Sequence, residues 1–215
     1  MKEQKEQRGQ KEQRQWEEAQ VFERDWWGNC ANTVWEDVKQ MNLAKYLGLK
    51  IVPNAYTNFR IPLSGQSVLD IGGGPSSILL KCENVSGTVI DPCNYPEWVG
   101  MRYKEAGINY HRIKGEDIPI NLEYDEVWIY NVLQHTQDPK CFVEKALAVS
   151  GIIRVFEWVE IGTNDGHPHS FTKEILEGYF KGEGKVVNLN SGGLYGKAFY
   201  GIFLGEHYGT QTREI

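Results

Sequence analysis

Hydrophobic side chains are almost absent from the first 15 residues, which repeat Lys, Arg, Glu and Gln. A helix formed there would have no apolar face to bury, so we expect residues 1–15 to be disordered. From residue 16 to residue 49 hydrophobic positions recur at helical spacing, with a break at Gly28 and Asn29. This pattern predicts two helices joined by a short turn, the second of which ends at Gly48.

After residue 65 the pattern changes to short β-branched runs that alternate with helical stretches. Seven strands are predicted, at residues 67–71, 88–90, 109–113, 126–130, 152–158, 185–189 and 198–204. Helices are predicted at 76–82, 97–106, 140–149 and 173–180. Such alternation is typical of a parallel sheet with crossover helices. Because only the turn Ser191-Gly192-Gly193 separates the last two strands, they should form an antiparallel pair at one edge.

These patterns predict one α/β fold, a seven-stranded mostly parallel sheet with an antiparallel C-terminal edge pair and helices on both faces. We expect residues 66–215 to form a ligand-binding domain of this kind. Residues 16–65 would be an N-terminal helical extension that forms a lid or packs on the sheet. A length of 215 residues accommodates one such domain with an extension.

Composition narrows the classes of partner. The formal net charge of −6 disfavours a nucleic acid, because binding to phosphates depends on clustered Lys and Arg. No apolar run reaches the roughly 20 residues of a membrane helix, so no membrane partner is expected. The four cysteines are far apart in the sequence and no secretory signal precedes them, which indicates reduced thiols and a cytoplasmic protein: Cys30, Cys82, Cys93 and Cys141. The oligomeric state is not predicted.

The strongest local signal is a predicted strand that runs into three glycines, Gly72, Gly73 and Gly74, and then into a helix. Glycines allow a sharp turn and a close approach of the backbone to a ligand, as in loops that bind nucleotide cofactors. A turn without any ligand is the structural alternative. A nicotinamide dinucleotide is a rival ligand, but its motif has a third glycine where this chain has Ser77.

An acidic residue, Asp91, ends the second predicted strand, 21 residues after Asp70, and is followed by Pro92. A carboxylate at this point accepts hydrogen bonds from ribose hydroxyls. Together with the glycine loop it indicates an adenosine-containing cofactor.

Five segments, VLDIGGGPSS, TVIDP, KGEDIPI, YDEVWIYNVLQHTQDP and GHPHSFTKEILEGYF, occur in this order between about residues 66 and 204. In order and spacing they resemble the class I S-adenosylmethionine-dependent methyltransferases of the broad small-molecule type. The resemblance implies a Rossmann-like fold and S-adenosylmethionine as the cofactor. It assigns contacts with the methionine part, the ribose, the adenine and the pocket wall to these residues: Asp70, Gly72, Gly73, Gly74, Asp91, Pro92, Glu116, Asp117, Asn131, Val132 and Leu133.

Four residues are candidates for a general base in methyl transfer: Tyr130, His135, His167 and His169. His135 follows the fourth strand and has a structural alternative, in which its ring bonds backbone around the turn. His167 and His169 are two residues apart, but no cysteine or carboxylate cluster completes a ligand set, so no metal site is predicted.

The segment 25–33 is dense in aromatic and amide side chains, and Trp26, Trp27, Asn29 and Asn32 are candidates for the acceptor pocket. The alternative is a helix turn packed on the sheet. The function predicted first is methyl transfer to an O or N atom of a small molecule. RNA or protein methylation, a non-catalytic cofactor-binding module and a nicotinamide-dependent oxidoreductase are the alternatives.

Overall fold

A computed structural model gives the structure of the chain and describes residues 2–208. Its helices and 3-10 turns are α1 (Lys2–Trp27), η1 (Ala31–Trp35), α2 (Asp37–Tyr46), η2 (Ile78–Lys81), α3 (Glu97–Glu105), η3 (Gly115–Asp117), η4 (Leu133–His135), α4 (Pro139–Ala148) and α5 (Lys173–Phe180). Its strands are β1 (Val52–Asn54), β2 (Asn58–Pro62), β3 (Ser67–Ile71), β4 (Cys82–Glu83), β5 (Ser86–Ile90), β6 (Asn109–His111), β7 (Tyr124–Tyr130), β8 (Ser150–Trp158), β9 (Lys185–Ser191) and β10 (Leu194–Leu204).

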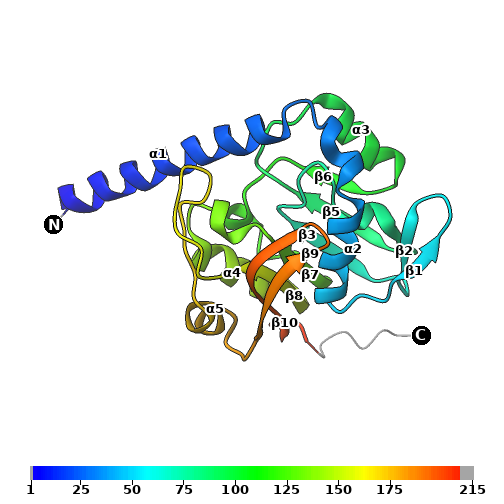
Figure 1. Cartoon of the computed structure of the whole chain (residues 1–215). Helices are drawn as coiled ribbons and strands as arrows, with labels where there is room; N and C mark the ends of the chain where they lie inside the picture. The colour runs from blue at the N-terminus through cyan, green and yellow to red at the C-terminus, as the bar shows by residue number, and fades with distance from the viewer. Residues whose placement is uncertain (1, 209–215) are drawn as a thin grey trace.

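The main sheet has seven strands in the order β6-β5-β3-β7-β8-β10-β9 (Figure 1). The strands from β6 to β8 are parallel to one another, whereas β10 is antiparallel to both β8 and β9. Both Gly192 and Gly193 have positive φ angles in the tight turn between β9 and β10. The predicted fold class is therefore confirmed, including the edge pair. The strand order reverses between β3 and β7, which is where ligands bind in open α/β sheets.

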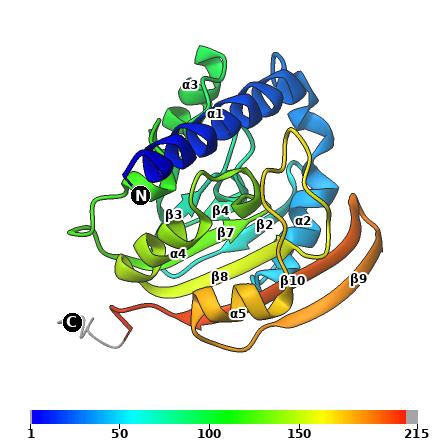
Figure 2. The ribbon, with the colours of Figure 1, turned by 90° about the vertical axis from the view of Figure 1, so that its left-hand side faces the viewer.

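Side chains alternate between the two faces of the sheet and build two hydrophobic clusters. Val127 and Ile129 of β7 pack with α4 and α5, whereas Trp128 and Tyr130 pack with α2 and α3. Helices therefore cover both faces (Figure 2). The second cluster also contains Leu43, Ala44 and Leu47 of α2, so the chain before residue 66 shares a core with the sheet. The division of the chain at this residue remains a prediction.

The N-terminal segment differs from the expectation. A single helix, α1, runs from Lys2 to Trp27, although we expected disorder up to residue 15. Exposed pairs at i,i+4 spacing, Gln13 with Glu17 and Arg14 with Glu18, support the polar half without an apolar face. This half projects beyond the rest of the molecule (Figure 1).

Two further differences concern short elements. The segment expected to be a helix at 76–82 is a 3-10 turn, η2, followed by β4. A small three-stranded sheet of β1, β2 and β4 was not predicted. Its strands are two to five residues long, which is too short for a period-2 pattern to be distinguished from a loop.

Candidate functional site

A cavity of roughly 830 Å³ lies at the carboxyl ends of β3, β5 and β7, at the point where the strand order reverses. Eight of the predicted cofactor residues line it: Gly72, Gly73, Gly74, Asp91, Pro92, Glu116, Asn131 and Val132. Segments far apart in the sequence therefore meet around one space, because parallel strands all end at the same edge of the sheet.

The glycine loop after β3 packs closely on its neighbours. A Cβ atom at Gly72 would lie 2.1 Å from Cγ2 of Val132, and one at Gly73 would lie 2.7 Å from Oδ2 of Asp70. Gly72 and Gly74 also have positive φ angles of 75° and 57°. Only glycine meets the steric and conformational demands of this loop, which lays the backbone along the cavity wall.

Asp91 is buried just after the end of β5, and its carboxylate connects the glycine loop with the segment that follows β5. Its Oδ2 accepts a hydrogen bond from the Gly74 amide at 3.1 Å, and its Oδ1 accepts one from the Cys93 amide at 2.9 Å. Burial raises the pKa of Asp91 to about 7, although both hydrogen bonds act in the opposite direction. A carboxylate has about four acceptor positions, so Asp91 has acceptor capacity left for a ligand.

Asp70 was predicted to contact the cofactor, but the structure corrects this placement. Its side chain lies on the same face of β3 as Val68, behind the glycine loop, and does not line the cavity. There it accepts hydrogen bonds from the Ser77 hydroxyl and, at 2.5 Å, from the Tyr130 hydroxyl. Burial raises the pKa of Asp70 to about 7. Asp70 therefore supports the glycine loop from the side opposite to the cavity.

The segment after β7 forms the opposite wall. Asn131 has a left-handed backbone with φ 54°, a conformation that asparagine tolerates better than most residues. The buried carboxylate of Glu157 on β8 accepts hydrogen bonds from the amides of Val132 at 2.9 Å and Leu133 at 2.6 Å. Burial raises the pKa of Glu157 to about 7. Glu157 therefore holds the backbone of this segment in place.

Two residues were predicted to contact the adenine, and only one of them lines the cavity. This residue is Glu116, whose Oε1 accepts hydrogen bonds from the amides of Gln137 and Asp138. Gly115 lies against Phe142, and a Cβ there would be 2.2 Å from the ring. Asp117 is exposed and outside the cavity. Leu133, also predicted to line the pocket, is fully buried in the core because its side chain points away from the cavity.

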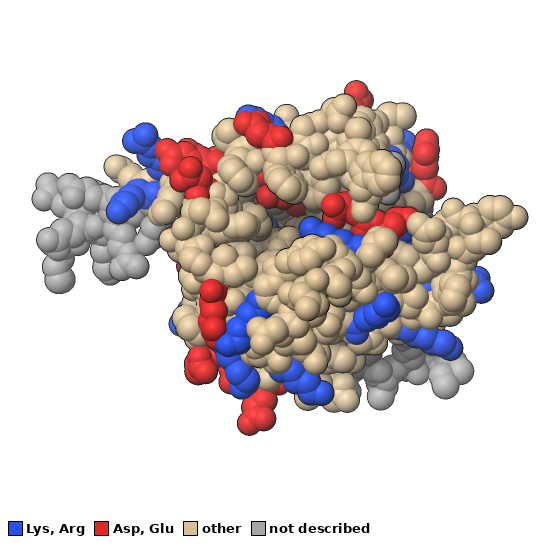
Figure 3. Space-filling model, in the orientation of Figure 1, with Lys and Arg blue, Asp and Glu red and all other residues tan. Residues whose placement is uncertain are grey.

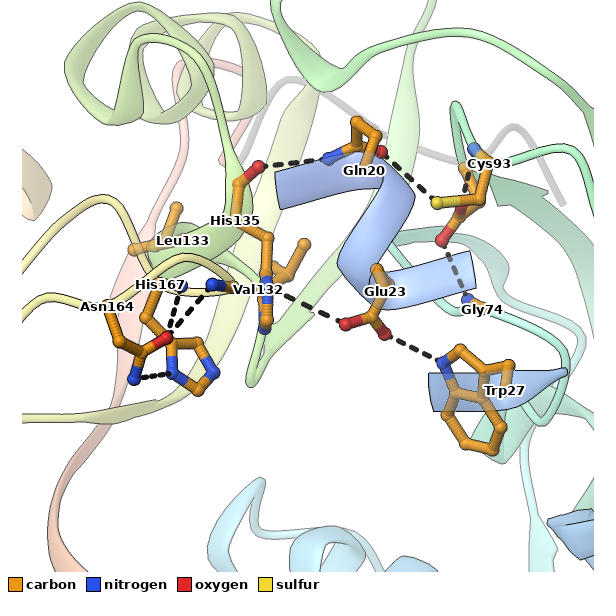
Figure 4. Close-up of polar contacts among 12 residues, drawn as sticks. Gln20, Glu23, Trp27, Gly74, Cys93, Val132, Leu133, His135, Asn164 and His167 are labelled. Atoms are coloured by element: carbon orange, nitrogen blue, oxygen red, sulfur yellow. Dashed lines mark hydrogen bonds and ion pairs between the residues drawn. The ribbon is translucent and has the colours of Figure 1, made fainter. Parts of the chain in front are cut away.

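Helix α1 covers the cavity with four side chains: Trp16, Gln20, Glu23 and Trp27. Gln20 donates to the carbonyl oxygen of His135 at 3.2 Å and accepts a hydrogen bond from the Cys93 thiol at 3.1 Å (Figure 4). The indole of Trp27 donates to Glu23 at 2.7 Å. The second half of α1 is therefore fastened to two of the loops that follow the strands.

The other candidates from segment 25–33 do not reach the cavity. Trp26 is 66% exposed, and Asn29 bonds the amide of Ala31. Asn32 also lies outside the cavity. Trp26 and Trp27 differ because consecutive helical residues point about 100° apart.

Two of the four base candidates line the cavity, namely Tyr130 and His135. Burial raises the pKa of Tyr130 well above its ordinary value, and its hydroxyl is committed to Asp70. His167 lies behind His135 at 4.7 Å between ring centroids, and its pKa is lowered by burial and by His135. His169 is outside the cavity, with Nε2 2.9 Å from the carbonyl oxygen of Thr136.

Several cavity residues were not predicted: Trp16, Gln20, Glu23, Glu36, Lys39, Gln40, Leu43 and Tyr95. Most lie on α1 and α2, whose sequences show helical periodicity but not which helix turn faces the sheet. Lys39 and Lys114 are the cationic side chains of the described cavity lining.

Three further features of the described chain concern metal ions, membranes and charged partners. Within residues 2–208, no group of three or more His, Cys, Asp or Glu side chains is placed to hold a metal ion. Of the helices in this part of the chain, none has the length and apolar character needed to cross a bilayer. Acidic and basic side chains are intermixed on the face shown in Figure 3.

Comparison with known proteins gives a likeness of structure but not of sequence. No family profile matches the chain, and no curated protein sequence matches it. Among solved structures, magnesium protoporphyrin IX methyltransferase from Synechocystis PCC 6803 with bound S-adenosylmethionine has a TM-score of 0.55 and 10% identity, covering 87% of this chain and 97% of that one.

The N-methyltransferase NodS from Bradyrhizobium japonicum WM9, in complex with S-adenosylhomocysteine, has a TM-score of 0.54 and 12% identity over 78% of this chain and 86% of that one. A cyclase, SpnF, has a TM-score of 0.51 and 16% identity over 71% and 58%. Two of the three structures hold an S-adenosyl compound. The chain has the fold of the class I S-adenosylmethionine-dependent methyltransferases.

Proposed function

We propose that the chain is an S-adenosylmethionine-dependent methyltransferase that transfers a methyl group to an O or N atom of a small-molecule acceptor. One observation carries this proposal: the glycine loop, Asp91 and the segment 131–132 meet around a cavity at the point where the strand order reverses. The fold alone does not specify the reaction, since a structural neighbour is described as a cyclase.

The residues of the cavity fit the cofactor. The backbone of Gly72 and Gly74 would lie along its methionine and ribose, because no side chain stands between this backbone and the cavity. The remaining acceptor capacity of Asp91 suits ribose hydroxyls. Glu116 lies at the edge assigned to adenine.

The bound sulfonium would supply an electrophilic methyl group, and the protein would align the acceptor with it. Trp16 and Trp27 give the cavity two flat apolar surfaces on the side of α1, while Glu23 and Gln40 give it polar groups that fix orientation. These features favour a small acceptor over RNA or a protein.

Calorimetric titration with S-adenosylmethionine, S-adenosylhomocysteine and NAD tests the proposal, in a buffer at about pH 8 where Asp91 is largely ionised. We expect both adenosyl ligands to bind and NAD not to bind. Asp91→Ala should weaken binding by about 1–3 kcal/mol, or about 5- to 150-fold, because charged hydrogen bonds are lost.

Asp117→Ala is the matched control, because this carboxylate lies just outside the cavity. It should leave both affinities unchanged. Binding of NAD would reverse the cofactor assignment in favour of an oxidoreductase. Failure of all three ligands to bind would leave an interaction module as the better description of the chain.

A further inference from the structure

Glu23 and His135 face each other at the lid side of the cavity. Glu23 lies on α1, and its Oε2 is 3.7 Å from Nδ1 of His135, which belongs to η4 (Figure 4). Both side chains line the cavity and are mostly buried, with exposed fractions of 13% for His135 and 23% for Glu23. The separation is that of an ion pair formed when the imidazole is protonated.

The geometry gives the two ring nitrogens different environments. Nδ1 is buried and has no hydrogen-bond partner within residues 2–208, and the Glu23 carboxylate faces it from 3.7 Å, so a proton on this atom is favoured and the neutral ring would keep its lone pair on Nε2. Among the side chains and backbone groups that the structure describes, none bonds Nε2 of His135, and the residue lines the cavity. The basic atom is therefore not committed to another described group of the chain.

Other titratable groups lie close to Glu23 and His135. The ring of His167, from the segment after β8, lies 4.7 Å from that of His135 between centroids with the planes tilted by 59°, and its Nδ1 lies 3.1 Å from Nδ2 of Asn164. Its pKa is lowered by burial and then by His135, while Glu23 acts in the opposite direction. Asp91 is the other acidic group that interacts with Glu23. One proton on the pair of imidazoles is favoured over two.

We propose that Glu23 positions His135 as the proton acceptor of the methyl-transfer step, so that the acceptor substrate is a hydroxyl or an N–H compound. This inference rests on the proposed function and adds a residue and a substrate class to it. The acceptor's O or N atom forms a bond to the methyl carbon, and the methyl–sulfur bond breaks with its electron pair remaining on sulfur. The acceptor's proton moves to Nε2 of His135. Glu23 then stabilises the imidazolium that results.

A purely structural role for α1 would give the same contacts, since Gln20 also holds His135 through its backbone. The two roles differ in the state of the ring. Removing a packing contact leaves the preference for a proton on Nδ1 of His135 nearly unchanged, whereas removing the carboxylate that faces this atom weakens it.

The test is NMR of the full chain with ¹⁵N-labelled histidine, with the His135 signals assigned by a His135→Gln variant. In the unaltered protein we expect the neutral His135 ring to carry its proton on Nδ1. Glu23→Gln should lower the share of the neutral His135 ring that carries its proton on Nδ1, since the carboxylate that faces this atom is lost. Asp25→Asn removes the same charge from an exposed site on α1 and should leave this share unchanged.

A rate measurement with S-adenosylmethionine and a panel of phenols and aromatic amines gives the second readout. Glu23→Gln should lower kcat about tenfold or more and change the KM for the acceptor much less, whereas Asp25→Asn should change neither. A neutral ring protonated on Nε2, or a kcat that Glu23→Gln leaves unchanged, overturns the inference. Binding of S-adenosylhomocysteine, followed in the same samples, separates this failure from failure of the proposed function.

Discussion

Trp26 and Trp27 are adjacent in the sequence, yet one faces solvent and the other faces the cavity. Trp27 is held by a 2.7 Å hydrogen bond from its indole to Glu23, whereas Trp26 is 66% exposed. The difference follows from the rotation of about 100° between consecutive helical residues. A substitution of Trp27 can therefore be compared with the same substitution of Trp26 as its control.

We expect Trp27→Ala to reduce turnover about tenfold or more and to weaken S-adenosylhomocysteine binding much less, because Trp27 lines the cavity on the side of α1, where the acceptor is proposed to bind. Trp26→Ala should change neither quantity. Steady-state kinetics together with calorimetry measure both. Equal losses of turnover and cofactor affinity in Trp27→Ala would show that the ring serves the cofactor instead.

Asp70 and Asp91 show how residue position within or after a strand decides the role of a carboxylate. Asp70 lies within β3, so the alternation of the strand turns it to the buried face with Val68. Asp91 lies one residue beyond β5, at the cavity. Both pKa values are raised to about 7 by burial.

At the scale of elements, α1 has two halves with different tasks. Residues 9–11, 14 and 15 have exposed side chains, whereas Ala19 is fully buried and Gln20 bonds two loops of the cavity. The polar half is supported by its own i,i+4 pairs, and the second half by contacts with the rest of the fold.

Deletion of residues 1–12 should therefore change S-adenosylhomocysteine affinity by less than about twofold, since the described lining of the cavity begins at Trp16. Gln20→Ala should weaken the affinity by up to about 30-fold, because two hydrogen bonds that fasten α1 are lost and each contributes about 1 kcal/mol. Calorimetry on both variants checks this. A large loss on deletion would place part of the site in the polar half.

At the scale of the whole molecule, three buried carboxyl groups surround the carboxyl ends of the central strands: Asp70, Asp91 and Glu157. Burial raises the pKa of each to about 7. An unfolded chain would titrate them near 4. Between about pH 4 and pH 7 the folded protein therefore binds more protons at these groups than the unfolded chain does.

The contribution of these groups to stability consequently falls as pH rises through this window, by up to about 1.4 kcal/mol per pH unit for each group. Asp70→Asn removes one of them. We expect the free energy of unfolding of the unaltered protein, relative to Asp70→Asn, to decrease between about pH 5 and pH 7 and then to level off. Urea denaturation at several pH values measures it, and a difference that stays constant or increases over this window would contradict the prediction.

Sequence alone determined the elements whose signals are local. The helix at 173–180 and the strand at 67–71 were predicted with the bounds that the structure has. Asp138 and Thr172 cap α4 and α5 through hydrogen bonds to the amides of Cys141 and Ile175. Periodicity, caps and glycine turns depend on neighbours within a few residues, and the order of such elements was sufficient to predict the sheet.

Only the tertiary structure decided which side chains meet at the cavity. Glu23 and His135 are 112 positions apart, and the facing of α1 and α2 depends on packing against the sheet. Asp70 and Leu133 belonged to matching motifs but are turned into the core, while Trp16 and Lys39 belonged to no motif and line the cavity. A motif records the residue types of a site, whereas the direction of each side chain is set by long-range contacts that no short segment contains.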